Sequence, residues 1–270
     1  MIFSQSWWNL IVVLQVVLLC CLVILPFGLR GNVFSAPKSQ ALTLISEDVS
    51  VPVVARQVTV RIFNDQLVGS GVIVERRGKF YTVLTCAHVV AESPNNRYSI
   101  LTPDGKSYEG RLLNFRQFGN ADLALVQFNS VRNYEVAAIA DPQTLTIGDR
   151  IYAAGFPNWH WSNSQTIDST RDWGGKAFKL TSGEVAMLPE KSLQDGYQIG
   201  YTNEIEQGMS GGPVLDRFGR LIGINGRLKY PPQGINAFIF ADGTTPSDEL
   251  FNQMQSLSWA VPITKFHKAL

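Results

Sequence analysis

The segment GMSGGP at residues 208–213 holds the side chain best placed in this sequence to act as a nucleophile. Three glycines surround Ser210, and glycine adopts positive φ angles and lets other groups approach the main chain closely. Such a backbone could expose the serine hydroxyl and turn the N–H groups of Gly208 and Ser210 toward one point. Two N–H groups at that point would hold the oxygen of a tetrahedral acyl intermediate. For this segment alone, the alternative is a glycine-rich hairpin turn with a solvated serine.

A serine nucleophile needs a base, and the base needs an acid that orients it. The sequence has three histidines, of which His160 lies between two tryptophans in a polar loop and His267 lies near the end of the chain. His88 ends the strand-like run YTVLTCAH and is the candidate base. Asp122 begins the apolar run DLALV, where a charged side chain is costly to bury unless it is paired. It is the candidate orienting acid, although an aspartate that merely begins a strand would also fit this pattern.

Three segments, in chain order, resemble the catalytic segments of trypsin-like serine proteases: TCAH at 85–88, NADLAL at 120–125 and GMSGGP at 208–213. The closer resemblance is to the bacterial, HtrA-like branch of that family. It extends over roughly residues 50–265, and three further segments support it: GDRIYAAGFP at 148–157, TSGEV at 181–185 and LIGING at 221–226. The resemblance implies a serine endopeptidase that works through an acyl-enzyme intermediate. Ser210 would attack the peptide carbonyl, His88 would act as the base and Asp122 would orient the imidazole. The N–H groups of Gly208 and Ser210 would form the oxyanion hole.

From residue 51 onward, short apolar runs alternate with turns rich in glycine, asparagine and aspartate. Short strands at regular spacing predict a β-sandwich or a β-barrel, and closing each half of the domain into a barrel removes exposed sheet edges. Together with the resemblance, this pattern predicts an all-β fold of the chymotrypsin type, with two six-stranded antiparallel β-barrels and the active site in the cleft between them. The first barrel would take about residues 51–140 and the second about residues 148–265.

Three features interrupt the strands predicted for the second barrel. The polar stretch 158–176 carries three tryptophans, which would contact substrate or pack locally against the barrel. Residues 235–240 are predicted to form a strand. The sequence TPSD at 245–248 then predicts the start of a short helix that ends at about Gln255, because it offers a cap, a proline in the first turn and an acid three residues on.

The resemblance also suggests how the side chain before the cut bond is chosen. In such proteins that side chain enters a pocket walled by two segments, here residues 202–207 and 223–227. Glu204 lies six residues before Ser210, where the family often places the pocket floor, and a carboxylate there would attract Lys or Arg. Ile205 could instead form the floor and favour small aliphatic side chains, in which case Glu204 would point to solvent.

The segment from Gly223 to Gly226 resembles the family's edge strand, which pairs with the substrate backbone. Asn225 and Gly226 are therefore predicted to bind substrate. Met209 departs from proteases that mature from a zymogen, which carry at this position an aspartate that pairs with a freed N-terminus. The resemblance thus implies an enzyme that N-terminal cleavage does not activate. HtrA-like relatives commonly add a PDZ domain after the protease, and we expect none here because the sequence ends shortly after Pro262.

Length and composition predict one globular domain with an appendage, since the 270 residues include 45% hydrophobic residues and carry a formal charge of +1. A net charge this close to zero gives no indication of the basic surface that nucleic-acid binding requires. No cluster has the spacing of metal ligands, and the chemistry implied needs neither a metal nor an organic cofactor. The expected partner is a protein or peptide substrate. Cys86 has no second cysteine in the domain and is expected to be a small buried residue, not a nucleophile.

The appendage is N-terminal, where residues 7–29 contain no charged residue. A run of about 20 apolar residues can span a bilayer. Residues 1–30 are therefore predicted to be a transmembrane anchor or a signal segment, and the absence of a basic start favours the anchor. Residues 31–50 would tether this segment to the protease domain at 51–265. The protein would then be membrane-anchored, or secreted or periplasmic. The basic residues after the span favour a cytoplasmic C-terminal side, whereas the resembling proteins more often work outside the cytoplasm.

A second class of function also fits the sequence. A protease fold that has lost its activity could serve as a catalytically inactive peptide-binding module. The intact set of serine, histidine, aspartate and glycines argues against it, because decay usually removes at least one of them.

Overall fold

The computed structural model describes residues 50–64, 68–91, 97–113, 118–141, 145–163 and 165–267. The apolar segment predicted at 7–29 and nearly all of the predicted tether lie outside these residues. Within the described ranges, no helix is long and apolar enough to cross a membrane.

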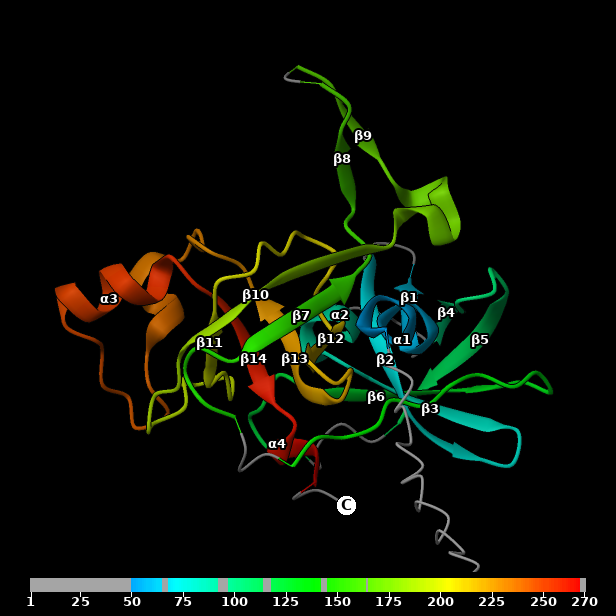
Figure 1. Ribbon diagram of the computed structural model, residues 1–270, viewed down its shortest axis with the longest axis horizontal. Coiled ribbons are helices and arrows are strands. Elements are labelled where there is room, and N and C mark those ends of the chain that lie inside the picture. Colours follow the sequence, from blue (N-terminus) through cyan, green and yellow to red (C-terminus); the bar gives the residue numbers. More distant parts are fainter. Residues whose placement is uncertain are drawn as a thin grey trace, which may run out of the picture. The chain divides into compact units, whose positions relative to one another are not determined.

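The first half of the described chain folds into a closed antiparallel barrel (Figure 1). Its six strands are β1 (Thr59–Phe63), β2 (Val68–Arg77), β3 (Phe80–Thr85), β4 (Arg97–Leu101), β5 (Ser107–Leu112) and β6 (Ala124–Asn129). They are hydrogen-bonded in the order β1-β2-β3-β6-β5-β4, and β4 pairs with β1 to close the barrel. Closure leaves neither of these strands with an unpaired edge.

The second half forms another closed barrel of six antiparallel strands. They are β7 (Arg150–Gly155), β10 (Lys179–Met187), β11 (Ile199–Tyr201), β12 (Pro213–Asp216), β13 (Leu221–Arg227) and β14 (Ser258–Pro262). Their order is β10-β11-β14-β13-β12-β7, with β7 pairing back to β10. The prediction of an all-β protein with two six-stranded barrels is confirmed.

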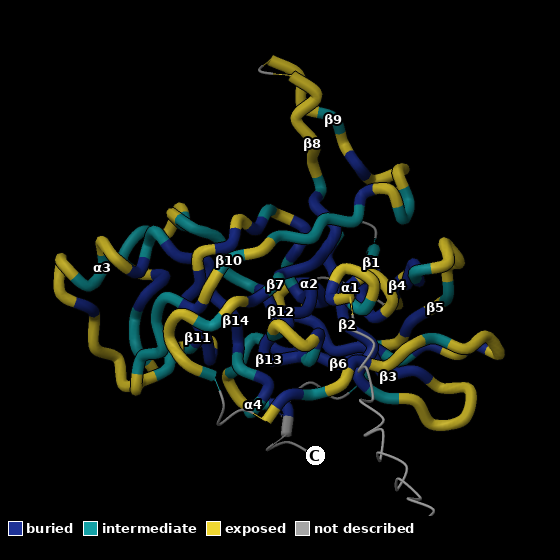
Figure 2. The backbone as a smooth tube through the Cα atoms, viewed as in Figure 1, coloured by how far each residue is buried: buried dark blue, intermediate teal, exposed yellow. Residues whose placement is uncertain are grey.

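Buried hydrophobic residues of the strands form the core, and one cluster joins residues of both barrels. The buried stretches of the chain are dark blue in Figure 2. In barrel 1, a Cβ on Gly71 would lie 2.4 Å from the Cγ1 of Val83, so only a glycine lets β2 come this close to β3. In barrel 2, the largest fully buried side chain is Trp259, whose indole N–H donates to the carbonyl of Met254. Burial of this apolar surface is the main driving force for folding the two barrels.

Short helices connect and cover the barrels. They are α1 (Val51–Val58), α2 (Ala87–Val90), α3 (Asp248–Gln255) and α4 (Thr264–His267), with the 3₁₀ helices η3 (Arg171–Ala177) and η4 (Gly234–Phe238). The predicted helix near residues 245–255 is confirmed as α3, and the Ser247 hydroxyl accepts from the N–H of Leu250 as its cap.

Two secondary-structure predictions were wrong. Residues 51–58 form helix α1 instead of the predicted strand and turn, because a proline in the first turn favours a helix start. The helix buries Val51, Ala55 and Val58 against the barrels. Residues 235–240 were predicted as a strand but lie largely in η4, whose Phe238 packs its ring on Trp259 of β14 and on Phe251 of α3.

The tryptophan-containing stretch forms a two-stranded hairpin, β8 (Trp159–Trp161) and β9 (Ile167–Ser169), that projects away from both barrels (Figures 1 and 2). The sequence left open whether these tryptophans contact substrate or pack against the barrel. Trp161 is 63% exposed and does not pack against the barrel. The root of the hairpin is firmly held, because the buried guanidinium of Arg61 in β1 donates to the carbonyl and the hydroxyl of Thr170 at 2.8 Å each.

Candidate active site

His88 and Asp122 meet because two paired strands of barrel 1 end at the same place. The register of β3 and β6 sets Thr85 opposite Ala124, so the residues after β3 and before β6 share one edge. The Nδ1 of His88 lies 2.6 Å from Oδ2 of Asp122, and the backbone N–H of His88 donates to Oδ1 at 3.0 Å. An Nδ1–H held by the carboxylate leaves Nε2 as the ring atom that can accept a proton.

The environment of this pair favours its charged forms. Burial raises the pKa of Asp122, but hydrogen bonds from His88 and Tyr197 outweigh burial, so the pKa of Asp122 lies below its ordinary value. Burial lowers the pKa of His88, but the hydrogen bond and the charge of Asp122 outweigh it, so the pKa of His88 lies above 6.5. Asp195 adds to this rise and Arg227 opposes it. His88 is therefore a stronger base than a free histidine while its side chain is still 49% exposed.

Ser210 comes from barrel 2, in the loop between β11 and β12, and faces the same hollow as His88. Both residues line a cavity of about 950 Å³, together with Asp122 and Gly226. The hydroxyl of Ser210 donates to the carbonyl of Gly226 at 3.5 Å, a long contact that leaves it easily redirected. The structure therefore brings the three predicted triad residues to one cavity, although the serine hydroxyl contacts the Gly226 carbonyl and not the imidazole.

The backbone before Ser210 is oriented by hydrogen bonds to its carbonyl groups. The carbonyl of Gln207 accepts from the N–H of Asn158 at 2.8 Å, and the carbonyl of Met209 accepts from the N–H of Gly212 at 3.0 Å. In a trans peptide the N–H points opposite to the C=O. The N–H groups of Gly208 and Ser210 are thus directed away from these bonds, as two oxyanion donors would need to be.

Ser70 in β2 links this loop to barrel 1. Its hydroxyl donates to the carbonyl of Gly208 and accepts from the N–H of Phe156, both at 2.8 Å. Its own N–H donates to the carbonyl of Ser210 at 2.8 Å. A single buried serine therefore ties the residues on both sides of Met209 to barrel 1.

The glycines of the segment are required by close approach. Gly211 has φ 85°, and a Cβ there would lie 2.1 Å from the carbonyl oxygen of Ser70. A Cβ on Gly212 would lie 2.1 Å from the carbonyl oxygen of Ala154. Met209 is fully buried in the core of barrel 2. An apolar anchor thus stands where zymogen-derived proteases would have an ion-paired aspartate.

Sequence reasoning missed Tyr197, which lies just before β11. Its hydroxyl donates to Oδ2 of Asp122, and its ring lies under the guanidinium of Arg227, 4.5 Å from the ring centroid. Arg227 also pairs with Asp195 at 3.1 Å, and the backbone carbonyl of Asp195 accepts from the N–H of Asp122 at 2.8 Å. No spacing rule in the sequence signals this cluster, because its members come from three separate segments.

The two predicted pocket-floor residues do not line the cavity. Glu204 is exposed and forms an ion pair with Lys229, whose ammonium also donates to the carbonyl of Thr202 at 2.9 Å. Ile205 is buried in the core of barrel 2 with Met209. The carboxylate of Glu204 is therefore paired with Lys229 and exposed to solvent, which matches the alternative in which Glu204 points to solvent.

Asn225 and Gly226 differ from each other in what they can offer a substrate. Asn225 is fully buried, its amide donates to the carbonyl of Ala154 at 3.1 Å, and its own carbonyl accepts from Gly211. Gly223 and Ile224 do not lie on an edge, because β13 pairs there with both β12 and β14, but the register with β12 ends at Ile224. Gly226 is the first residue of this strand that lines the cavity.

Cys86, His88 and Asp122 place ligand atoms within 4.8 Å of one another, among the described residues. The thiol of Cys86 is buried and donates to the carbonyl of Asn225 at 3.0 Å. Burial, followed by the charge of Asp122, raises the pKa of this thiol well above its ordinary value. A protonated thiol is a poor ligand and a poor nucleophile, so this cluster fits a proton-transfer site better than a metal site.

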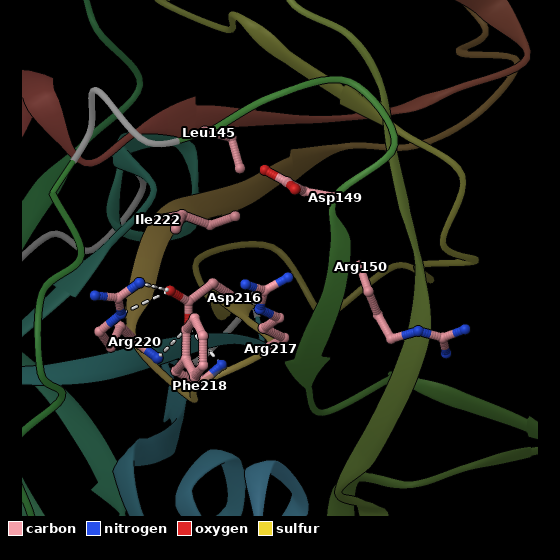
Figure 3. Close-up of a pocket in the computed structure, with 8 residues that line it drawn as sticks. All are labelled: Leu145, Asp149, Arg150, Asp216, Arg217, Phe218, Arg220 and Ile222. Atoms are coloured by element: carbon pink, nitrogen blue, oxygen red, sulfur yellow. Dashed lines mark hydrogen bonds and ion pairs between the residues drawn. The ribbon is translucent and has the colours of Figure 1, made fainter.

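A smaller hollow of about 120 Å³ lies on barrel 2 near the β12–β13 turn and contains three arginines (Figure 3). Asp216 pairs with Arg220 at 2.7 Å, and Arg217 stacks on Phe218. Arg150 extends away from that pair (Figure 3). Since the guanidinium groups do not converge on one point, this hollow lacks the geometry of an anion site.

Known proteins resemble the chain across this site. Residues 69–224 match the family model described as a trypsin-like peptidase domain. The periplasmic pH-dependent serine endoprotease DegQ of Escherichia coli (strain K12) is 31% identical over 189 residues, which cover 69% of this chain and 37% of that protein. A probable periplasmic serine endoprotease, DegP-like, of Buchnera aphidicola is 30% identical over 169 residues, which cover 62% of this chain and 31% of that protein. The chain thus spans about a third of the length of these relatives.

A solved structure supports the two-barrel architecture. The serine endoprotease from Yersinia pestis superposes with a TM-score of 0.54 at 21% identity, covering 81% of this chain and 64% of that one. At this level of identity the likeness bears on the fold alone.

The close approach of the Ser70 carbonyl to Gly211 predicts that an alanine at residue 211 destabilises the fold more than an alanine at Gly219. We expect Gly211→Ala to lower the free energy of unfolding by roughly 3 kcal/mol, because the new Cβ would collide with the Ser70 carbonyl. Gly219→Ala is the control, since Gly219 has a comparable φ of 76° but its nearest neighbour is Val54 at 3.4 Å. We expect that change to cost about 1 kcal/mol. Chemical denaturation of both variants measures the difference, and equal costs would contradict the steric explanation.

Proposed function

This chain belongs to the trypsin-like peptidase family, and on that premise we propose that it is a serine endopeptidase with Ser210, His88 and Asp122 as its triad. The observation that carries the proposal is the short contact between His88 Nδ1 and Asp122 on the wall of a cavity that Ser210 also lines. An oriented imidazole beside a serine hydroxyl is the arrangement that nucleophilic acyl transfer needs.

The reaction follows from these positions. When a peptide carbonyl enters the cavity, the hydroxyl of Ser210 turns from Gly226 toward Nε2 of His88 and attacks the carbonyl carbon. His88 takes the hydroxyl proton and returns it to the leaving amine, which departs as the acyl-enzyme forms. A water molecule activated by His88 then hydrolyses the acyl-enzyme and restores Ser210. Asp122 holds the imidazole tautomer and stabilises the imidazolium throughout.

The developing oxyanion would be held by the N–H groups of Gly208 and Ser210. Support comes from the bonds that Asn158 and Gly212 make to the preceding carbonyls, because these bonds set the peptide orientations before substrate arrives. Donors that are already in place need no reorganisation during the reaction. Loss of one such donor typically lowers the rate by a factor of about 100 to 1,000.

The inactive-module alternative is less well supported. A module that only binds peptides has no need for a buried carboxylate with three hydrogen-bond donors or for an imidazole with a raised pKa. Such groups are costly to keep, and perturbed titrations of this kind cluster at catalytic sites.

Membrane attachment and compartment are proposed from the sequence and the relatives. The two relatives described above are named periplasmic proteases. We propose that this chain also acts outside the cytoplasm, on protein or peptide substrates, and that residues 7–29 attach it to the membrane.

The triad is tested by labelling with a serine-reactive phosphonate. We expect the wild-type protein to be labelled, and Ser210→Ala and His88→Ala to lose labelling and peptide hydrolysis, since both groups act in one step. The two losses should not add in the double variant. Ser162→Ala, in the exposed hairpin, is the matched serine control and should be labelled like the wild type. If the wild-type protein is not labelled although folded, the inactive module becomes the better proposal.

Specificity before the cut bond is tested at Glu204. Because its carboxylate is exposed and paired with Lys229, we expect no preference for Lys or Arg that depends on this charge. Matched substrates with Arg, Lys, Val, Ala or Phe at that position should be ranked alike by the wild type and by Glu204→Gln. A preference for Arg and Lys that disappears in Glu204→Gln would restore Glu204 as the specificity residue.

The membrane proposal is tested by fractionation. Full-length protein should remain with membranes after high-salt and alkaline washes if residues 7–29 span the bilayer. N-terminal sequencing that finds a mature protein beginning near Ala36 would replace the anchor with a cleaved signal segment.

A further inference from the structure

We propose that Tyr197 is a positioning residue for the reaction, whose hydroxyl holds the carboxylate of Asp122 in the orientation that fixes His88. This inference rests on the proposed function, because it assigns a fourth member to the same triad. It is carried by contacts around Asp122 that the triad itself does not require.

The carboxylate of Asp122 has donors on both oxygens. The backbone N–H of His88 donates to Oδ1, whereas Oδ2 receives both the imidazole N–H and the Tyr197 hydroxyl. The side chain of Asp122 is only 11% exposed, so bulk water cannot readily replace a lost donor. Without the tyrosine, Oδ2 would keep its bond to the imidazole N–H but lose the second donor that fixes the orientation of the carboxylate, so the ring would be aligned less precisely.

Tyr197 is held in place from both sides. Its ring is fully buried beneath the guanidinium of Arg227, at 4.5 Å from the ring centroid. On the other side, a Cβ on Gly226 would lie 2.1 Å from the tyrosine hydroxyl, so the hydroxyl reaches Asp122 only because residue 226 is glycine. This gives Gly226 a second reason to be glycine beside its place on the cavity wall.

The same segment also holds the main chain of Asp122. The carbonyl of Asp195 accepts from the N–H of Asp122 at 2.8 Å, two residues before Tyr197 supplies its hydroxyl. The loop before β11 therefore forms hydrogen bonds with both the backbone and the side chain of Asp122. Since Asp122 belongs to barrel 1 and Tyr197 to barrel 2, these hydrogen bonds form only when the two barrels are packed together.

The charged and titratable groups that face this pair determine the electrical effect of the tyrosine. They are Cys86, Asp195, Tyr197 and Arg227, and burial raises the pKa values of the Cys86 thiol and the Tyr197 hydroxyl so that both stay neutral. A neutral hydroxyl that donates to Asp122 draws off part of the carboxylate's charge. The attraction of Asp122 for a protonated His88 is thereby weakened.

Tyr197→Phe tests the inference, because it removes the hydroxyl and keeps the ring. His88 must be neutral to act as a base, so activity falls as the pH drops through its pKa. Removing the hydroxyl strengthens the pull of Asp122 on the imidazolium, so the acid limb of kcat/KM should move up by roughly half to one pH unit. We also expect kcat to fall while KM is unchanged, because the hydroxyl touches Asp122 and not the substrate.

Tyr201→Phe is the matched control. Tyr201 is also fully buried, but its hydroxyl donates to the side chain of Asn225 and makes no contact with Asp122. Its loss should leave the acid limb where it is in the wild type. If Tyr197→Phe and Tyr201→Phe both keep the wild-type limb, Tyr197 has only a structural role and the inference fails.

The failure of this inference is distinguishable from failure of the proposed function. An unlabelled, inactive wild-type protein overturns the proposed function, whereas an active wild type with an unmoved limb in Tyr197→Phe overturns only the inference. Where Tyr197→Phe is itself inactive, the pKa of His88 is read by NMR titration of full-length Ser210→Ala, with and without Tyr197→Phe. An unchanged His88 pKa in that comparison also overturns the inference.

Discussion

The contact on which the site depends is the one between Ser70 of barrel 1 and the loop that carries Ser210. Ser70 uses its N–H, its hydroxyl hydrogen and its hydroxyl oxygen on three groups of barrel 2, and its carbonyl accepts from the hydroxyl of Thr85 at 2.7 Å. The three bonds that involve the hydroxyl or the carbonyl of Ser70 are buried, and buried polar groups are costly unless they are paired. Sliding one barrel against the other would break the three bonds from Ser70 to barrel 2 at once. The two barrels therefore hold one relative position, in which Ser210 and His88 line one cavity.

The glycine spacing of the nucleophile loop follows from this contact. Ser70 and Thr85 come so near to residue 211 that a side chain there would overlap both of them. Gly208 has φ 96° and lies where a Cβ would meet the side chain of Asn158. Met209 between them turns inward and is fully buried, so the loop is anchored by apolar packing as well as by hydrogen bonds.

A second set of contacts controls the charge at the site. Asp122 remains ionised in a nearly dry setting because donors from His88 and Tyr197 stabilise the carboxylate. The charges of Asp195 and Arg227 have opposite effects on the pKa of His88, since Asp195 raises it and Arg227 lowers it. The basicity of His88 is thus a balance among groups from both barrels. The region of Glu204 is different, since its carboxylate pairs with Lys229 and neither residue lines the cavity that contains Ser210.

The sequence by itself determined the features that short segments encode. The strand pattern together with the resemblance to trypsin-like proteases predicted two barrels, TPSD predicted α3, and the residues of the proposed triad stand in three segments that each adjoin a strand. Interactions between distant segments were decided only by the tertiary structure. Tyr197 and Asp122 are 75 residues apart, and Ser70 and Gly208 are 138 apart. Tertiary structure also decided the partner of Glu204, the burial of Ile205 and Asn225, and the two-sided pairing of β13. Local propensity and periodicity constrain neighbours along the chain, whereas the partners of a side chain depend on which strands barrel closure brings together.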